Sequence, residues 1–252
     1  MATAYGQAGE RRSEEKFFLV MAWLMSATIV AGFALNLVLG RSTFAVPLVF
    51  HLHAFVFFGW VALYLAQNTL IAGEGLALHR RLGWLAVAWV PAMLVLGVMM
   101  TLVSLRTHGG PPFFDKREFL VGNPVGLLAF AALVASAITL RRRTAWHRRL
   151  MLCGMALLTA PGLGRLLPTP LFIPYAWVVV NLATLVFPGF AMIADRRRHG
   201  RVHPALWWGV AIIVGALAAG EAIAHSPVGS RLTSWVVEGT PGAARPVEAH
   251  FP

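Results

Sequence analysis

The segment FFLVMAWLMSATIVAGFALNLVLG, residues 17–40, carries no charged side chain over its whole length. A transmembrane helix needs roughly 20 consecutive apolar residues to cross the hydrocarbon core. Hydrocarbon offers the backbone no hydrogen-bonding partner, so a run of this length predicts a helix that satisfies its own backbone groups. Charged residues at 11–16 precede the segment and no small-residue cleavage site follows it, which indicates a membrane anchor rather than a cleaved signal peptide.

Six further apolar segments follow along the chain, separated by short loops. They comprise residues 47–71, 82–105, 119–140, 150–167, a segment that ends before Asp195, and 204–225. The sequence therefore predicts an all-α, polytopic membrane protein built as a bundle of seven transmembrane helices. We expect a cytoplasmic N-terminal segment (1–16), a seven-helix transmembrane domain (17–225) and a mostly disordered external tail (226–252) that is rich in Pro, Gly, Ser and Ala.

Composition and charge agree with a membrane location. With 58% hydrophobic and 12% charged residues, the chain lies well outside the range of ordinary soluble domains. A net charge of +11 would suggest nucleic acid in a soluble protein, but here the basic residues cluster beside the apolar segments, so the expected partner is the lipid bilayer. The connections on the N-terminal side hold 14 of the 21 Lys and Arg residues. The positive-inside rule then predicts an N-terminus in the cytoplasm and a C-terminus outside.

A four-residue motif, His-Arg-Arg-Leu, occurs twice, at residues 79–82 and 147–150. Each copy begins an apolar segment that contains a proline, Pro91 or Pro161, which suggests two related helical hairpins. With the stretch AWHRRLMLCGMALLTAPGLGR (145–165), these motifs resemble a broad family of bacterial multi-pass membrane proteins of unknown function. The resemblance covers roughly the middle half of the chain. It implies a multi-pass protein of the bacterial inner membrane and highlights the motif residues and Arg165, but it supplies no mechanism.

Ionisable residues inside apolar segments are functional candidates by default, because they are costly to place in a membrane. His53, Trp60, Tyr64 and Gln67 have the spacing of one helix face, which favours an inward orientation for His53. Glu221 and His225 are four residues apart, so they can pair on one face of the last segment. The alternative interpretation is that Trp60 and Tyr64 are core residues and that Glu221 and His225 form a simple ion pair at a helix end.

Polar residues of five segments occur at one predicted depth near the outer face. They are His53, Asn123, Arg165, Tyr175 and Glu221, and we expect them to line an outward-facing pocket. The glycine- and proline-containing loop 107–118 is a candidate lid, and Asn181 a candidate for the deeper part of the pocket. On the cytoplasmic side, His79 and His147 begin helices beside arginines. They are candidates for binding a phosphate or a haem propionate, although ordinary contacts with lipid headgroups explain them more simply.

Several chemistries are excluded by missing motifs. The sequence contains no Cys-x-x-Cys, His-Glu-x-x-His or glycine-rich phosphate loop. The lone cysteine, Cys153, excludes an internal disulfide framework. The two lysines, Lys16 and Lys116, lie outside the predicted spans, so no intramembrane Schiff base can form.

Three functions remain open, and the sequence does not decide whether the protein is an enzyme. The first is a redox protein that holds haem b, with His53 and His225 as axial metal ligands. The second is a proton-coupled carrier or membrane enzyme for a small lipophilic or anionic molecule, such as a quinone, in which His53, Glu221 and Arg165 act on the substrate. The third is an accessory or assembly subunit that binds a membrane-protein partner. None of the three involves nucleic acid.

Overall fold

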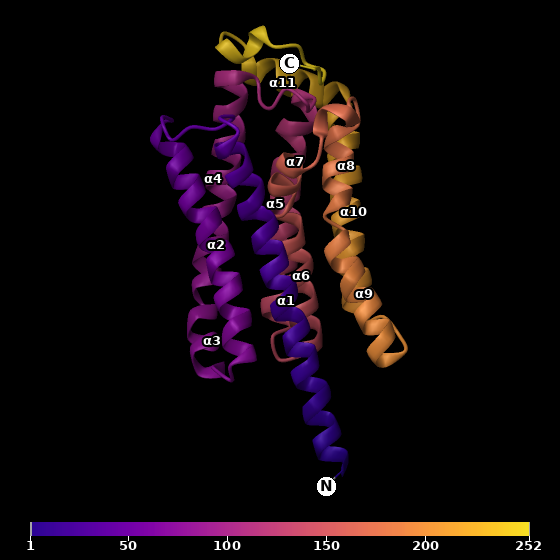
Figure 1. Cartoon of the computed structure of the whole chain (residues 1–252). Coiled ribbons are helices and arrows are strands. Elements are labelled where there is room, and N and C mark those ends of the chain that lie inside the picture. Colours follow the sequence, from indigo (N-terminus) through magenta and orange to yellow (C-terminus); the bar gives the residue numbers. More distant parts are fainter. Residues whose placement is uncertain (1, 252) are drawn as a thin grey trace.

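The computed structural model describes residues 2–251 and is built from helices, with no strand in that range (Figure 1). The first half contains α1 (Ala2–Val38), α2 (Leu48–Ala72), α3 (Leu76–Gly83), α4 (Leu85–His108) and α5 (Lys116–Thr139). The second half contains α6 (Thr144–Leu157), α7 (Ala160–Leu166), the 3-10 turn η1 (Thr169–Phe172), α8 (Ala176–Ala183), α9 (Val186–His199), α10 (Pro204–Ala224), α11 (Pro227–Val237) and the 3-10 turn η2 (Pro241–Ala244).

Within residues 2–251, six helical segments are long and apolar enough to cross a membrane. They are Arg12–Val38, Leu48–Ala72, Leu76–His108, Lys116–Thr139, Ala176–His199 and Pro204–Ala224. The remaining predicted span, 150–167, is divided between α6 and α7, because the helix ends at Leu157 and restarts at Ala160. Thr159 lies in this break, is fully buried, and donates its hydroxyl to the Ala156 carbonyl oxygen at 2.6 Å. The multi-pass, all-helical prediction is confirmed, while the count of seven spans stays a prediction.

Helix α5 stands at the centre of the bundle and packs against α4, α6 and α10 (Figure 1). Helix α1 packs against α2 and α7, and α2 packs against α4. The bundle has two ends, the tail end and the arginine end. The tail end carries the C-terminal segment 226–251, drawn in yellow at the top of Figure 1. The arginine end, opposite, carries Arg148 and Arg149 at the start of α6 and Arg196 to Arg198 at the end of α9.

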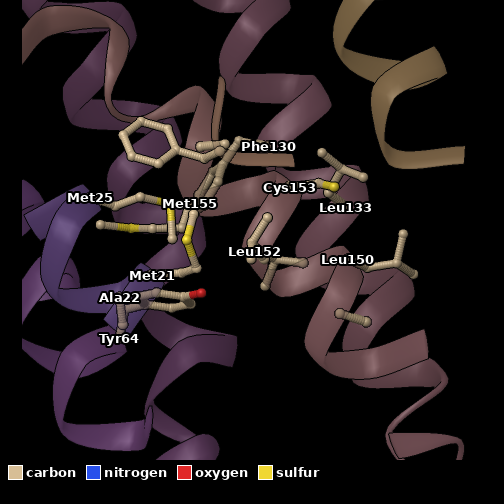
Figure 2. Close-up of a cluster of buried hydrophobic side chains, with 14 of the residues drawn as sticks. Met21, Ala22, Met25, Tyr64, Phe130, Leu133, Leu150, Leu152, Cys153 and Met155 are labelled. Carbon is tan, nitrogen blue, oxygen red and sulfur yellow. The ribbon is translucent and has the colours of Figure 1, made fainter. Parts of the chain in front are cut away.

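The main core lies between α1, α2, α5 and α6. Figure 2 shows Met21 and Met25 of α1 meeting Tyr64 of α2, Phe130 of α5 and Met155 of α6, and all of these side chains are buried. Methionine fills irregular gaps well because its side chain is unbranched and polarisable. The core therefore joins the two halves of the chain through apolar packing.

Small residues allow the closest helix crossings. A Cβ atom added to Gly32 of α1 would collide with the backbone of Gly162 in α7, and one added to Gly209 of α10 would collide with Cys153 of α6. Small residues at helix interfaces are common in membranes because packing, rather than the hydrophobic effect, holds helices together there. Cys153 is thus a buried packing residue.

The prediction of a disordered tail is wrong. Residues 226–251 form α11 and η2 and fold over the tail end, where Val236 and Val237 are buried against α4 and α5. The ammonium of Lys116, itself buried, donates to the carbonyl oxygens of Gly242 and Arg245 at 2.6 Å each. Composition alone predicted disorder because the ordering groups lie far away in the sequence, in loop 107–118 and the first turn of α5.

Candidate functional site

Three titratable side chains meet at the tail end, and we call them the acidic cluster: Glu118, Glu221 and His225. Glu118 lies in the first turn of α5, where a negative charge is favoured by the helix dipole. Glu221 lies in the last turn of α10, and His225 is the C-terminal cap of the same helix. The strong packing of α5 on α10 brings the two carboxylates to one imidazole.

The imidazole lies between the two carboxylates. Its Nε2 atom is 3.2 Å from Oε1 of Glu118 and 3.7 Å from Oε2 of Glu221. The side chain of Glu118 is 7% exposed, whereas that of His225 is 47% exposed. The cluster therefore extends from the interior of the protein to its surface, with the histidine on the outside.

One oxygen of each carboxylate has no hydrogen-bond partner. Oε2 of Glu118 and Oε1 of Glu221 are both buried and unpartnered. Leaving a charged oxygen buried without a donor costs several kcal/mol, so such a group favours taking up a proton or a cation. A single imidazolium can balance at most one of the two carboxylates. The arrangement is thus that of a proton-binding or cation-binding site.

A narrow cavity lies one helical turn below the cluster. Its volume is about 20 Å³, which is room for one water molecule. It is lined by residues of α5, α6, α8 and α10: Gly122, Gly126, Leu157, Trp177, Asn181, Ile213, Ala216 and Leu217. Gly122 follows Glu118 by four residues and Leu217 precedes Glu221 by four, so each lies on the same helix face as its carboxylate. The cavity therefore lies on the same faces of α5 and α10 as the acidic cluster, one turn closer to the middle of the bundle.

The residues that were predicted to line one pocket lie in separate groups at the tail end. Glu221 and His225 join the acidic cluster on α5 and α10, as the spacing of four residues predicted. His53 of α2 lies instead near the backbone of Leu96 and is influenced by the charge of Arg165 in α7. Its ring stacks on Phe57 at 4.2 Å, and its Nδ1 atom is buried without a partner. Among the described residues, no hydrogen bond or ion pair links these two groups.

The other pocket candidates have local roles. Arg165 stacks over the ring of Phe33 at 4.0 Å and donates to the Pro161 carbonyl oxygen at 2.7 Å. The amide of Asn123 donates to the carbonyl of Phe119 within its own helix at 2.7 Å. Tyr175 is 69% exposed at the surface.

Trp60 and Tyr64 are core residues. Their side chains are 2% and 4% exposed, and Trp60 packs edge-on against Phe130 at 5.1 Å. The predicted inward face of α2 is therefore correct, but most of it is packing surface.

The arginine end contains a buried ion network in which two arginines pair with two carboxylates, although Nε of Arg148 is buried without a partner. Arg149, 2% exposed, donates from Nε to Asp195 and from Nη2 to Glu14, at 2.9 Å in each case. Arg148 also pairs with Glu14. The network joins α1, α6 and α9, so these two arginines are already neutralised by the protein's own carboxylates.

The imidazole of His203 borders this network and caps α10. Its Nδ1 atom accepts a hydrogen bond from the Ala205 N–H at 3.1 Å, which requires that nitrogen to be unprotonated. Burial, followed by the nearby charge of Arg149, lowers the pKa of His203. The electrostatic environment and the cap therefore favour the same neutral form.

The two His-Arg-Arg-Leu motifs meet at this end. The rings of His79 in α3 and His147 in α6 lie 6.3 Å apart, edge to face. Nδ1 of His147 is 2.9 Å from the Ala137 carbonyl oxygen. In the orientation that satisfies both ends of its side-chain amide, Gln67 accepts a hydrogen bond from the Gly83 N–H at 2.9 Å through its oxygen. The amide nitrogen of Gln67 donates to His79. These contacts fix the ends of α2, α3 and α6.

Two groups of side chains have the spacing of metal ligands, with ligand atoms within 4.8 Å of one another: Glu118, Glu221 and His225, and Glu14, Asp195 and His199. In the second group the carboxylates of Glu14 and Asp195 already bind arginine. In the first group both carboxylates keep a buried, unpartnered oxygen. Tetrahedral zinc ligands lie roughly 3.3 Å apart, given metal–ligand bonds of about 2.0 to 2.1 Å. The acidic cluster is therefore the better candidate for a divalent cation.

Sequence reasoning missed Glu118 and Lys116. Both were treated as loop residues, because they immediately precede an apolar segment, yet both are among the most buried charged residues described. The available signal was an N-terminal helix cap, since Asp115 accepts from the Arg117 N–H at 2.7 Å and thereby begins α5 before Glu118. An aspartate three residues before a glutamate has the spacing of a helix start.

No family model matches the chain, and neither the curated proteins nor the solved structures include a significant match. The resemblance to a multi-pass family stays a prediction.

Proposed function

We propose that the protein is a multi-pass protein of the bacterial inner membrane that exchanges protons with a small lipophilic or anionic molecule through the acidic cluster. In this proposal the arginine end is cytoplasmic, the tail end faces outward, and α6 with α7 forms a seventh, interrupted crossing. The distribution of Lys and Arg supports the orientation. The packing of α7 on α1 and of α6 on α5 supports the seventh crossing.

The observation that carries the proposal is the pair of buried, unpartnered carboxylate oxygens on Glu118 and Glu221. Two carboxylates with one shared imidazole are best satisfied when they hold a proton between them. His225 is half exposed and touches both carboxylates, so it provides a path for that proton to water. The cavity one turn below has room for one water molecule between the cluster and the bundle interior, which supports proton transfer in that direction.

Infrared spectroscopy of the purified protein in lipid nanodiscs tests the proton site. At pH 7 we expect a band from a protonated carboxyl group that disappears in Glu118→Gln and in Glu221→Gln. The matched control is Glu238→Gln, because Glu238 is exposed at the end of α11. If the band is absent from the wild type, or if it survives both cluster variants, the proposal fails.

A second candidate function, binding of a divalent cation, has a specific observation in its favour. The distances from Nε2 of His225 to the two carboxylates, 3.2 and 3.7 Å, are close to the separation of zinc ligands. Calorimetric titration of the metal-free protein with Zn²⁺ separates the two candidates. Binding that is lost in both His225→Gln and Glu118→Gln would favour the cation, and the absence of binding would favour the proton.

The haem interpretation gains no support from the geometry. His225 faces Glu118, whereas His53 stacks on Phe57 in a different group of helices. An optical spectrum of the same preparation checks this point, because bound haem b would give a Soret band. The accessory-subunit interpretation predicts that cluster variants change the amount of protein without changing any proton signal.

A further inference from the structure

An apolar groove runs between α1 and α9 at the arginine end, far from the acidic cluster. Its volume is about 380 Å³, and it is lined by Phe17, Met21, Leu24, Phe190, Ile193, Ala194, Arg197 and Arg198. The residues from α1 are spaced by four and three positions, and those from α9 by three or four, so each set forms one face of its helix. Two apolar helix faces therefore confront each other across a gap.

The groove is open to the surroundings of the protein. Leu24, Phe190 and Ile193 are 48%, 50% and 51% exposed. The neighbouring helix α6 packs against both α1 and α9, so it lies behind the gap.

Two arginines stand at one end of the groove, and no acidic residue is among its lining residues. The guanidinium of Arg198 lies 5.0 Å from the ring centre of Phe17 and donates to the Ser13 carbonyl oxygen at 3.3 Å. Arg197 is exposed and forms no ion pair with any side chain that the structure describes. These two cations differ from Arg148 and Arg149, which the protein neutralises itself.

We propose that the groove binds an anionic phospholipid, with one acyl chain between α1 and α9 and its phosphate on Arg197 and Arg198. Arginine binds phosphate through two parallel hydrogen bonds, and basic pockets between helices bind anionic headgroups. The headgroup is anionic rather than zwitterionic because none of the described side chains that line the groove is a carboxylate that could receive an ammonium group. The site is independent of the proton site proposed above.

Native mass spectrometry with defined lipids tests the assignment. Phosphatidylglycerol should bind more tightly than phosphatidylcholine, and the double variant R197Q/R198Q should weaken phosphatidylglycerol binding about thirtyfold. The matched control is R142Q/R143Q, which removes the same charge from exposed positions at the same end. A second variant, Ala194→Phe, fills the groove without changing any charge and should also displace the lipid.

Three results would overturn the proposal. The first is equal binding of the two lipids by the wild type. The second is an equal loss in R142Q/R143Q, which would mean that only net charge matters. The third is unchanged binding in Ala194→Phe, which would place the headgroup on the arginines with no chain in the groove. Thermal unfolding of each variant identifies any that fails to fold, and Ala194→Leu then replaces Ala194→Phe as the smaller filling variant.

Discussion

The two ends of the bundle differ in how completely their carboxylates are paired with cationic side chains. At the arginine end, Glu14 and Asp195 both bind Arg149, and Glu14 also binds Arg148. At the tail end, Glu118 and Glu221 share one histidine and each keeps an oxygen without a partner. Removing one member of a satisfied buried ion pair is costly, whereas an unsatisfied group remains free to bind something else. The comparison distinguishes an ion network that stabilises the fold from a candidate reactive site in the same chain.

The largest expected effect comes from Arg149→Ala. This change leaves Asp195 without its cation and removes one cation from Glu14, which should lower the free energy of unfolding by about 3 to 5 kcal/mol. Thermal unfolding in detergent, followed by the fluorescence of the nine tryptophans, measures it. The exposed Arg142→Ala is the control and should change little. If the two variants were equally stable, the ion network at the arginine end would not stabilise the fold.

Lys116→Met should release the tail with a smaller cost. The variant loses two hydrogen bonds from a charged donor to the carbonyls of Gly242 and Arg245. It also removes a buried ammonium and its desolvation cost, which offsets part of the loss, and it leaves no buried charge without a partner. Faster hydrogen exchange in α11 and faster proteolysis of residues 226–251 would report the release. Arg231→Met, at an exposed position of α11, is the control. Unchanged protection of α11 would show that apolar packing alone holds the tail.

Matched glutamine variants at the two ends compare them directly. Glu14→Gln removes the negative charge that two arginines need, so it should lower stability by about 1 to 3 kcal/mol. Glu118→Gln removes a carboxylate that is only partly satisfied, so its effect on stability should stay within about 1 kcal/mol and can be stabilising. The same unfolding assay measures both. A reversed order would mean that the acidic cluster, rather than the arginine network, is the structural one.

The smallest expected effect is a pH dependence at the arginine end. Because the folded state lowers the pKa of His203, the unfolded chain binds the proton more readily, and stability falls as the pH drops through and below the ordinary histidine value of about 6.5. His203→Asn keeps a helix cap without a titrating ring, so its stability should depend less on pH between 5 and 7. Identical pH profiles for the two proteins would contradict this role for His203.

The positions of the helices were predictable, because uncharged apolar runs fix them. Residues 47–71 became α2 almost without change, and Pro47 caps it. The two prolines of the motif segments behaved differently: α4 continues through Pro91, whereas the chain breaks just before Pro161. Backbone contacts, among them the close approach of Gly162 to Gly32, distinguish these cases, and they are not visible in either segment alone.

The candidate site was only partly predictable for a related reason. The pairing of Glu221 with His225 follows from spacing on one helix, and it is present. The partner Glu118 comes from another helix, 107 residues from His225, so only the packing of α5 on α10 identifies it. A shared depth in the membrane indicates which residues lie at one level. It does not indicate which of them lie on the same side of the bundle, and His53 and Glu221 do not join one group.

The anchoring of Lys116 has a consequence for biosynthesis. Its acceptors at Gly242 and Arg245 follow it by 126 and 129 positions, so a ribosome completes α5 long before it makes them. Until residues 242 and 245 have been made, the ammonium of Lys116 lacks the two carbonyl acceptors that it has in the folded protein. Residues 226–251 can therefore cover the start of α5 only after the preceding helices of the bundle have been made.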